Sequence, residues 1–233
     1  MVFGREADRR TYADRMTRFV GRANVRKRLA PFEGAQGRTS YADGAVRIEL
    51  PGEVVLVRPP FGIAHEAEYE TVRLAPLFDA LAGDRIVAAL LVRLGGYAVG
   101  VFDGESLVAS KVGSRFVKNR HKKGGSSANR FRRRRQEQAL ALVTESAETA
   151  IRVLEPWRDR VEFVAMGGDR RAITEVLQVR PELAWLAERA IPRFFAVAEP
   201  RQQVLERLAY DLYSAELIAC SQGPLPNFAG EQS

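Results

Sequence analysis

The sequence predicts a mixed α/β sheet with helices on both faces, and three observations predict it. Residues 85–94 are nearly all apolar and rich in branched side chains, as in a strand that is buried on both faces. Two further strands, 97–102 and 107–112, follow across a glycine pair and across Asp103-Gly104, which is a strong hairpin signal. After this antiparallel meander, helical patterns alternate with apolar strands, which is typical of a mixed sheet.

The second half of the chain supplies these further elements. Residues 128–154 carry apolar side chains at helical spacing, and Pro156 ends this long helix. A fourth buried strand is expected at 161–166, followed by a turn at Gly167-Gly168-Asp169. The remaining predictions are a helix at 173–179, a helix at 183–190, a strand at 194–197 and a closing amphipathic helix at 201–220.

The first 83 residues are less regular. Residues 5–30 have apolar side chains at helical spacing and predict a helix, whereas residues 34–44 are rich in glycine and small polar residues and predict a loop. A hairpin is expected at 46–57 and a short helix at 72–81. The sequence therefore predicts three parts: a helical N-terminal extension (1–45), a main domain (46–222) and a disordered tail (223–233).

The composition indicates a cytoplasmic protein. The chain has 233 residues, 46% of them hydrophobic, which is enough to bury a core. Its longest apolar run, Ile86–Val92, is too short to cross a bilayer, and its N-terminus lacks the apolar region of a signal peptide. Cys220 is the only cysteine, which excludes an internal disulfide and any two-cysteine metal site.

The positive charge of the chain is concentrated in one segment, residues 111–135, which we call the basic segment. The whole chain has a net charge of +7, and this segment contains 11 basic residues and no acidic residue, so the rest of the chain has a net charge of −4. Such a concentration points to a polyanion, most simply a nucleic acid. The basic residues are Lys111, Arg115, Lys118, Arg120, Lys122, Lys123, Arg130, Arg132, Arg133, Arg134 and Arg135.

The order of residues within the basic segment adds to this interpretation. Its last arginines fall at the start of the predicted helix, where positive side chains oppose the helix dipole, so phosphate binding explains them better than stability does. Gly124-Gly125 lacks Cβ atoms and can approach a ligand backbone closely. Ser126 and Ser127 add small hydroxyl groups. A solvated basic loop with a glycine hinge is the alternative, but a strand and a capped helix flank this loop.

Three motifs give the chain a family resemblance: Leu94-Gly95-Gly96-Tyr97, then K-V-G-S-R-F-V from Lys111, then K-x-G-G-S-S-x-N-R-F-x-R-R-R from Lys122. With the order of elements, they resemble the bacterial VLRF-type release factors, a peptidyl-tRNA hydrolase family. These are related to the middle domain of the eukaryotic and archaeal class-one peptide release factor. The resemblance covers about 46–220.

The resemblance implies an RNase-H-like fold and a loop that enters the peptidyl-transferase centre to hydrolyse peptidyl-tRNA on obstructed large ribosomal subunits. Gly124 and Gly125 match the family's glycines, and the family's glutamine falls at Ser126 or Ser127, so these four positions are the expected catalytic residues. Expected partners are rRNA and peptidyl-tRNA, with no membrane, no cofactor, no metal and a monomer off the ribosome. The expected RNA-binding residues are Lys118, Arg120, His121, Lys122, Lys123, Asn129, Arg130, Arg132, Arg133, Arg134 and Arg135.

Two other functions stay open: a non-catalytic ribosome-binding factor that lost its glutamine, and an endonuclease that acts at the tRNA 3′ end. Asp79, Asp103 and Asp169 are the carboxylates that an RNase-H-like metal site would use, but Asp103 is explained by its turn and nothing brings the other two together. The Gly167-Gly168-Asp169 turn lacks a phosphate-binding motif and is expected to be an ordinary connection. His65 is expected to be exposed, and Cys220 to pack on an apolar helix face.

Overall fold

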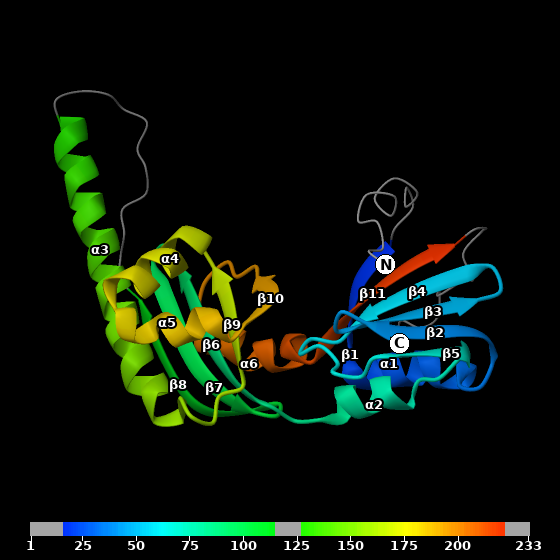
Figure 1. Ribbon diagram of the computed structural model, residues 1–233. Coiled ribbons are helices and arrows are strands. Elements are labelled where there is room, and N and C mark those ends of the chain that lie inside the picture. The colour runs from blue at the N-terminus through cyan, green and yellow to red at the C-terminus, as the bar shows by residue number, and fades with distance from the viewer. Residues whose placement is uncertain (1–15, 115–126, 222–233) are drawn as a thin grey trace. The chain divides into compact units, whose positions relative to one another are not determined.

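The chain forms two compact units, each described here by itself. The structure, a computed structural model, describes residues 16–114 and 127–221, and it places the side chains of 17–114 and 133–219 (Figure 1). Unit 1 comprises residues 1–83 and 213–233, and unit 2 comprises residues 84–212. The chain therefore leaves unit 1, builds unit 2, and returns to unit 1. No helix in the described ranges is long and apolar enough to cross a membrane.

Unit 2 is built on a five-stranded mixed sheet with the order β10-β9-β6-β7-β8. Strands β6, β7 and β8 form the predicted antiparallel meander, and β9 and β10 continue the sheet in parallel with β6. The predicted mixed sheet is therefore confirmed for this unit. The strands are β6 (Ile86–Arg93), β7 (Gly96–Asp103), β8 (Ser106–Ser114), β9 (Phe163–Gly168) and β10 (Ala190–Phe195).

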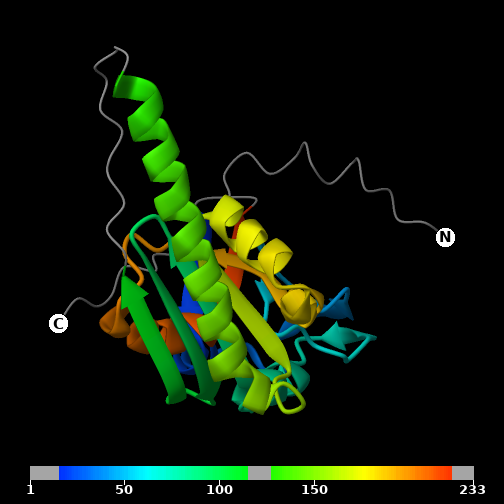
Figure 2. The same ribbon diagram turned by 90° about the vertical axis from the view of Figure 1, so that its left-hand side faces the viewer.

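Helices cover both faces of this sheet, as predicted. Ala88, Leu90 and Val92 of β6 join a buried cluster with α3, α4 and α5, whereas α6 packs on the opposite face (Figure 2). There Leu205 of α6 lies 2.9 Å from the position that a Cβ on Gly100 would take. The helices are α3 (Ser127–Leu154), α4 (Arg170–Val179), α5 (Ala184–Glu188) and α6 (Gln202–Leu212), with short 3-10 helices at Glu155–Trp157 and Pro181–Leu183.

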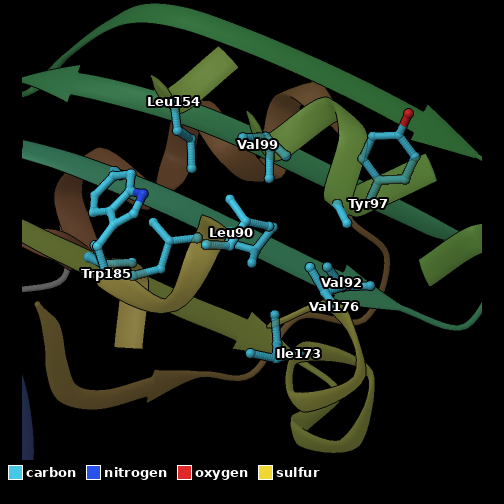
Figure 3. Packing of buried hydrophobic residues seen from close by; sticks show 14 of the residues in the cluster. Leu90, Val92, Tyr97, Val99, Leu154, Ile173, Val176 and Trp185 are labelled. Carbon is cyan, nitrogen blue, oxygen red and sulfur yellow. The ribbon is translucent and has the colours of Figure 1, made fainter. Parts of the chain in front are cut away.

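The core of unit 2 lies between β6, β7 and the helices α3, α4 and α5. Leu90, Val99 and Leu154 are fully buried, and Trp185 is buried beside them (Figure 3). Burial of one such leucine contributes about 1.5–3 kcal/mol relative to exposure. Trp157 is partly buried against the same cluster.

Unit 1 is built on a six-stranded antiparallel sheet with the order β1-β11-β4-β3-β2-β5. Two short helices, α1 (Arg22–Leu29) and α2 (Ala75–Ala82), and a 3-10 helix at Ala30–Phe32 accompany it. Val25, Leu77 and Leu81 of these helices pack in one cluster with the strands. The strands are β1 (Met16–Gly21), β2 (Gln36–Ala42), β3 (Ala45–Leu50), β4 (Glu53–Arg58), β5 (Ala67–Thr71) and β11 (Ser214–Ser221).

The prediction of a helical N-terminal extension is wrong for the residues that the structure describes. Of the predicted helix 5–30, residues 22–29 form an α-helix and residues 16–21 form β1, whereas residues 1–15 lie outside the described residues. The expected loop at 34–44 contains β2, in which Thr39 and Tyr41 point into the core. Strand β1 pairs with β11 at the other end of the sequence, which local spacing cannot reveal. Strand β2 forms a hairpin with the next strand, β3, and also pairs with β5.

The closing helix 201–220 is also corrected. Helix α6 ends at Leu212, and β11 follows and pairs with β1 and β4. The expected domain boundary at residue 45 does not coincide with the division into units, because β3, β4 and β5 belong to unit 1. The tail 223–233, predicted to be disordered, lies outside the described residues.

Candidate nucleic-acid interface

The basic segment connects β8, an edge strand of unit 2, to the long helix α3. Ser127 is the first residue of α3, and Asn129, Arg130 and Arg132 follow in its first two turns, where the structure describes the backbone. Arg133, Arg134 and Arg135 have described side chains. The other predicted site residues lie outside the described residues: Lys118, Arg120, His121, Lys122, Lys123, Gly124, Gly125 and Ser126.

Helix α3 extends well beyond the sheet of unit 2 at its N-terminal end (Figures 1 and 2). Its side chains become buried only from Leu142 onward, and Leu140, which the predicted apolar stripe includes, is 60% exposed. At 1.5 Å per residue, the stretch from Ser127 to Ala141 rises about 22 Å. The helix therefore carries its arginines away from the folded core of the unit.

The described arginines of this stretch present their charge to solvent. Arg133 and Arg134 are exposed and Arg135 is half-buried. Arg133 Nε lies 3.0 Å from Glu137 Oε1, but both side chains are mostly exposed, and an exposed pair four residues apart contributes only about 0.3–0.5 kcal/mol. Successive residues of a helix are about 100° apart, so Arg133, Arg134 and Arg135 point in different directions rather than lining one face. This arrangement suits a polyanion that approaches from several sides.

Tyr97 connects the two elements that flank the basic segment. Its side chain belongs to the buried cluster (Figure 3) and is 3% exposed. Its hydroxyl lies 3.1 Å from both Glu145 Oε1 and Thr149 Oγ1 of α3. Burial, with a contribution from Glu145, raises the pKa of Tyr97, so the hydroxyl stays protonated and donates a hydrogen bond to the Glu145 carboxylate. Arg152 Nη2 donates to Thr149 Oγ1 at 3.1 Å and extends the network along the helix.

Tyr97 also packs against β8. It pairs with Gly113 in the β7–β8 ladder, and a Cβ on Gly113 would lie 2.3 Å from Tyr97 Cζ. Gly96 pairs with Ser114, and a Cβ on Gly96 would lie 3.1 Å from the Gly113 carbonyl oxygen. The absence of side chains at both glycines therefore lets β7, β8 and the tyrosine ring pack tightly where the basic segment begins.

Two of the sequence motifs thus meet in the fold. The Gly95-Gly96-Tyr97 turn lies directly beside the K-V-G-S stretch that ends β8. Both motifs carried the resemblance, but Tyr97, Glu145 and Thr149 received no role from sequence reasoning. The available signal was a tyrosine in the first motif and a glycine in the second, and their contact requires the register of the sheet.

The remaining candidate carboxylates do not form a site. Asp169 caps α4, because its Oδ1 accepts from the backbone N–H of Arg171 at 2.8 Å and of Ala172 at 3.3 Å. Asp103 pairs with Ile86 at the start of β6, whereas Gly168, beside Asp169, pairs with Val92 at its end. Asp79 belongs to unit 1. Among the residues that the structure describes, no group of three or more His, Cys, Asp or Glu side chains could hold a metal.

The Gly167-Gly168-Asp169 turn is an ordinary connection, as expected. Gly168 has a φ of +96°, and a Cβ there would lie 2.1 Å from the Val92 carbonyl oxygen. A Cβ on Gly167 would lie 2.6 Å from the Phe195 carbonyl oxygen. Both glycines are therefore required by strand packing in the sheet.

Two predictions about single residues are corrected. His65 is half-buried rather than exposed: its ring packs on Tyr41 and Tyr69, and its Nε2 lies 2.9 Å from the Tyr69 hydroxyl. Cys220 lies in strand β11 and not on a helix. Both residues belong to unit 1.

The decisive comparison is with protein families. The family model described as the Actinobacteria/chloroflexi VLRF1 release factor, acVLRF1, matches residues 85–218, which is more than half of the chain. The chain belongs to this family. The match begins within one residue of unit 2 and extends through α6 into β11. It includes the whole basic segment and both motifs that meet at Tyr97.

The similarity to solved structures is weaker. The search of curated proteins found no match. The archaeal translation termination factor aRF1 is 16% identical, with 69% of this chain and 49% of that chain covered and a TM-score of 0.43, so the present chain spans about half of that factor. The Vms1 mitochondrial localization core is 12% identical, with 88% and 82% covered and a TM-score of 0.39. S. cerevisiae Dom34, a translation termination-like factor, is 7% identical, with 83% and 62% covered and a TM-score of 0.33.

Proposed function

We propose that the protein is a peptidyl-tRNA hydrolase that releases nascent peptides from stalled large ribosomal subunits. The basic segment would enter the peptidyl-transferase centre with Gly124-Gly125 at its tip. The partners would be rRNA and peptidyl-tRNA, the compartment the cytoplasm, and the free protein a monomer. Membership of a release-factor family supports this proposal.

One observation supports the proposal most strongly: the basic segment, with 11 basic residues and no acid, runs from the end of β8 into the first turns of α3, a helix that projects from the unit. To enter a pocket lined by RNA, a protein segment must be long, positively charged and narrow at its tip. The α3 helix supplies the length, the arginines and lysines supply the charge, and the glycine pair supplies a backbone without side chains. The Tyr97 network holds β8 and α3 in a fixed register behind this probe.

The chemistry demanded of the protein is limited. Water attacks the ester carbonyl, the bond from the carbonyl carbon to the ribose oxygen breaks, and the peptide carboxylate and the tRNA hydroxyl are released. Positioning of that water, together with stabilisation of the oxyanion, accelerates such a reaction without an acid or base of shifted pKa. The backbone N–H groups and hydroxyls of Ser126 and Ser127 would supply this positioning in place of the family's glutamine.

The test is peptide release from isolated large-subunit–peptidyl-tRNA complexes, with analysis of the tRNA 3′ end. Released peptide together with an intact 3′ end supports the hydrolase. Peptide that remains attached to a shortened tRNA fragment identifies an endonuclease and contradicts the proposal.

A second candidate is a non-catalytic factor that occupies the same site, and the serines at 126 and 127 specifically favour it. In that case the wild-type protein binds the complex without releasing peptide. Ser126→Gln and Ser127→Gln distinguish the two functions further. If a glutamine variant releases peptide and the wild type does not, the segment reaches the site but lacks the catalytic group.

A further inference from the structure

Helix α1 of unit 1 is a second concentration of positive charge, on a different unit from the basic segment. Its sequence, RANVRKRL, has four basic residues and no acid. Arg26, Lys27 and Arg28 are exposed, and Arg18 on the preceding strand β1 is exposed as well. The family match begins at residue 85, so it assigns nothing to this helix.

The geometry of the helix places these charges on its outer side. Val25 and Leu29 are buried and define the inner face. With 100° per residue, Lys27 lies near the centre of the opposite face, with Arg26 and Arg28 about 100° to either side. Ala23 and Asn24 are also exposed, so no large apolar side chain separates the three cations.

Arg26, Lys27 and Arg28 of α1 differ from three other arginines of unit 1 in whether they form ion pairs with glutamates. Arg38, Arg47 and Arg58 each lie 2.7–3.1 Å from a glutamate, in pairs with Glu70, Glu49 and Glu216. Within the described part of unit 1, Arg26, Lys27 and Arg28 form no ion pair. Two acids lie on neighbouring elements: Glu33 accepts from the Leu74 backbone N–H at 2.7 Å, and Asp79 lies on α2.

Helix stability explains only part of this pattern. Basic residues in the last turn interact favourably with the helix dipole, but exposed ones contribute little each, and mutual repulsion reduces the benefit of adding more. Arg26 also stacks on Phe78, with 5.4 Å between the guanidinium carbon and the ring centroid. This contact restricts the side chain and keeps its charge available to a partner.

A lipid surface suits the helix poorly. Interfacial helices present an apolar face to the membrane beside their basic face. Here the apolar residues Val25 and Leu29 are already buried in the core of unit 1. The exposed side chains of α1 itself are Ala23, Asn24, Arg26, Lys27 and Arg28, so the helix offers no large apolar side chain to a membrane. Its cationic surface is complementary to a phosphate backbone.

We infer that the outer face of α1 (Arg26, Lys27 and Arg28) is a second RNA-binding surface, which contacts rRNA phosphates of the large ribosomal subunit. The inference rests on the proposed function for the choice of the ribosome as partner, but it does not depend on the Gly124-Gly125 tip. It gives unit 1 a role in docking that is separate from hydrolysis.

The test compares two full-length variants that each remove three positive charges from unit 1. The first variant carries Arg26→Gln, Lys27→Gln and Arg28→Gln, because glutamine is a good helix former and preserves α1. The matched control carries Arg38→Gln, Arg47→Gln and Arg58→Gln. Binding to purified bacterial large subunits without peptidyl-tRNA is measured across salt concentrations, with unfolding curves for both variants.

We expect the α1 variant to bind about tenfold or more weakly than the control near 0.1 M salt. The slope of log K against log[salt] should become less negative by about 2.7, because three phosphate contacts are lost and each contributes roughly 0.9 to its magnitude. Equal affinity and slope in the two variants would overturn the inference. It would also be overturned if the α1 variant lost binding to anionic phospholipid vesicles while its binding to large subunits was unchanged. If the wild type failed to release peptide but the two variants still differed in subunit binding, the hydrolase proposal would be rejected and the α1 inference would remain.

Discussion

The ring of Tyr97 occupies the space that a side chain on Gly113 would need, since a Cβ there would lie 2.3 Å from Tyr97 Cζ. Gly113→Ala must therefore displace the ring and, with it, the hydrogen bonds to Glu145 and Thr149. We expect the free energy of unfolding to fall by about 1–3 kcal/mol, as for other overpacked sites. Denaturant unfolding measures this, with Ser114→Ala, at an exposed neighbouring position, as the control. Equal stability of the two variants would show that Tyr97 does not tie β8 to α3.

Tyr41 predicts a pH dependence of stability in the alkaline range. Its side chain is 2% exposed, its hydroxyl donates to the Arg73 carbonyl oxygen at 2.5 Å, and burial raises its pKa to about 12. The unfolded chain loses this proton near pH 10 and the folded chain only near pH 12. The stabilisation is therefore complete below pH 10 and is lost between pH 10 and about 12.

The measurement is the free energy of unfolding against pH for the wild type and Tyr41→Phe. We expect the wild type to lose roughly 2–3 kcal/mol more than the variant over this interval, because one pKa unit corresponds to about 1.4 kcal/mol. At neutral pH the variant should be less stable by about 1 kcal/mol, through the lost hydrogen bond. Parallel curves for the two proteins would exclude Tyr41 as the titrating group.

We expect the affinity for RNA to rise when the negative charge of Glu137 is removed. It is the acid that pairs with Arg133 on the exposed part of α3. Glu137→Gln should lower stability by no more than about 0.5 kcal/mol, since the pair is exposed. It should raise affinity for large subunits several-fold at low salt, whereas Arg134→Gln should lower it. Unchanged affinity in both variants would place this part of α3 outside the RNA contact.

A substitution at Asp169 distinguishes a structural role of this carboxylate from a catalytic one. Its Oδ1 caps α4, so Asp169→Ala should lower the free energy of unfolding by about 1 kcal/mol. Peptide release by the folded variant should equal that of the wild type. A large loss of release at unchanged stability would instead make this carboxylate part of the active site. Asp103→Ala is the matched carboxylate control, because Asp103 ends β7 and pairs with Ile86, at the opposite end of β6 from Val92.

Much of unit 2 could be predicted because its signals are local. The apolar run of β6, the Asp103-Gly104 hairpin and the stripe of α3 lie within short stretches of sequence, and each is found where it is expected. The two turn residues are Gly104, with a φ of +58°, and Glu105, so the turn lies one position later than the Asp-Gly pair indicates.

Unit 1 could be predicted only in part because its sheet joins distant segments. Phe19 of β1 pairs with Glu216 of β11, almost 200 residues later. Met16, Phe19 and Val20 happen to be spaced as in a helix. Strand β11 comes directly after the helical pattern of α6, and no turn signal in the sequence separates the two. Pairing across the sheet decides both conformations. The Tyr97 network was missed for the same reason, since its hydroxyl bonds to side chains 48 and 52 residues away.

The most direct test of the central claim is single-turnover peptide release by the wild type, Gly125→Pro and Gly230→Pro on isolated large-subunit–peptidyl-tRNA complexes. Proline fixes φ and removes the backbone N–H, so at residue 125 it should lower the release rate at least 100-fold while subunit binding is retained. The same substitution at residue 230, near the C-terminus, should leave the rate unchanged. Release by Gly125→Pro at the wild-type rate would contradict the account, because the glycine pair would then not be the element that reaches the ester.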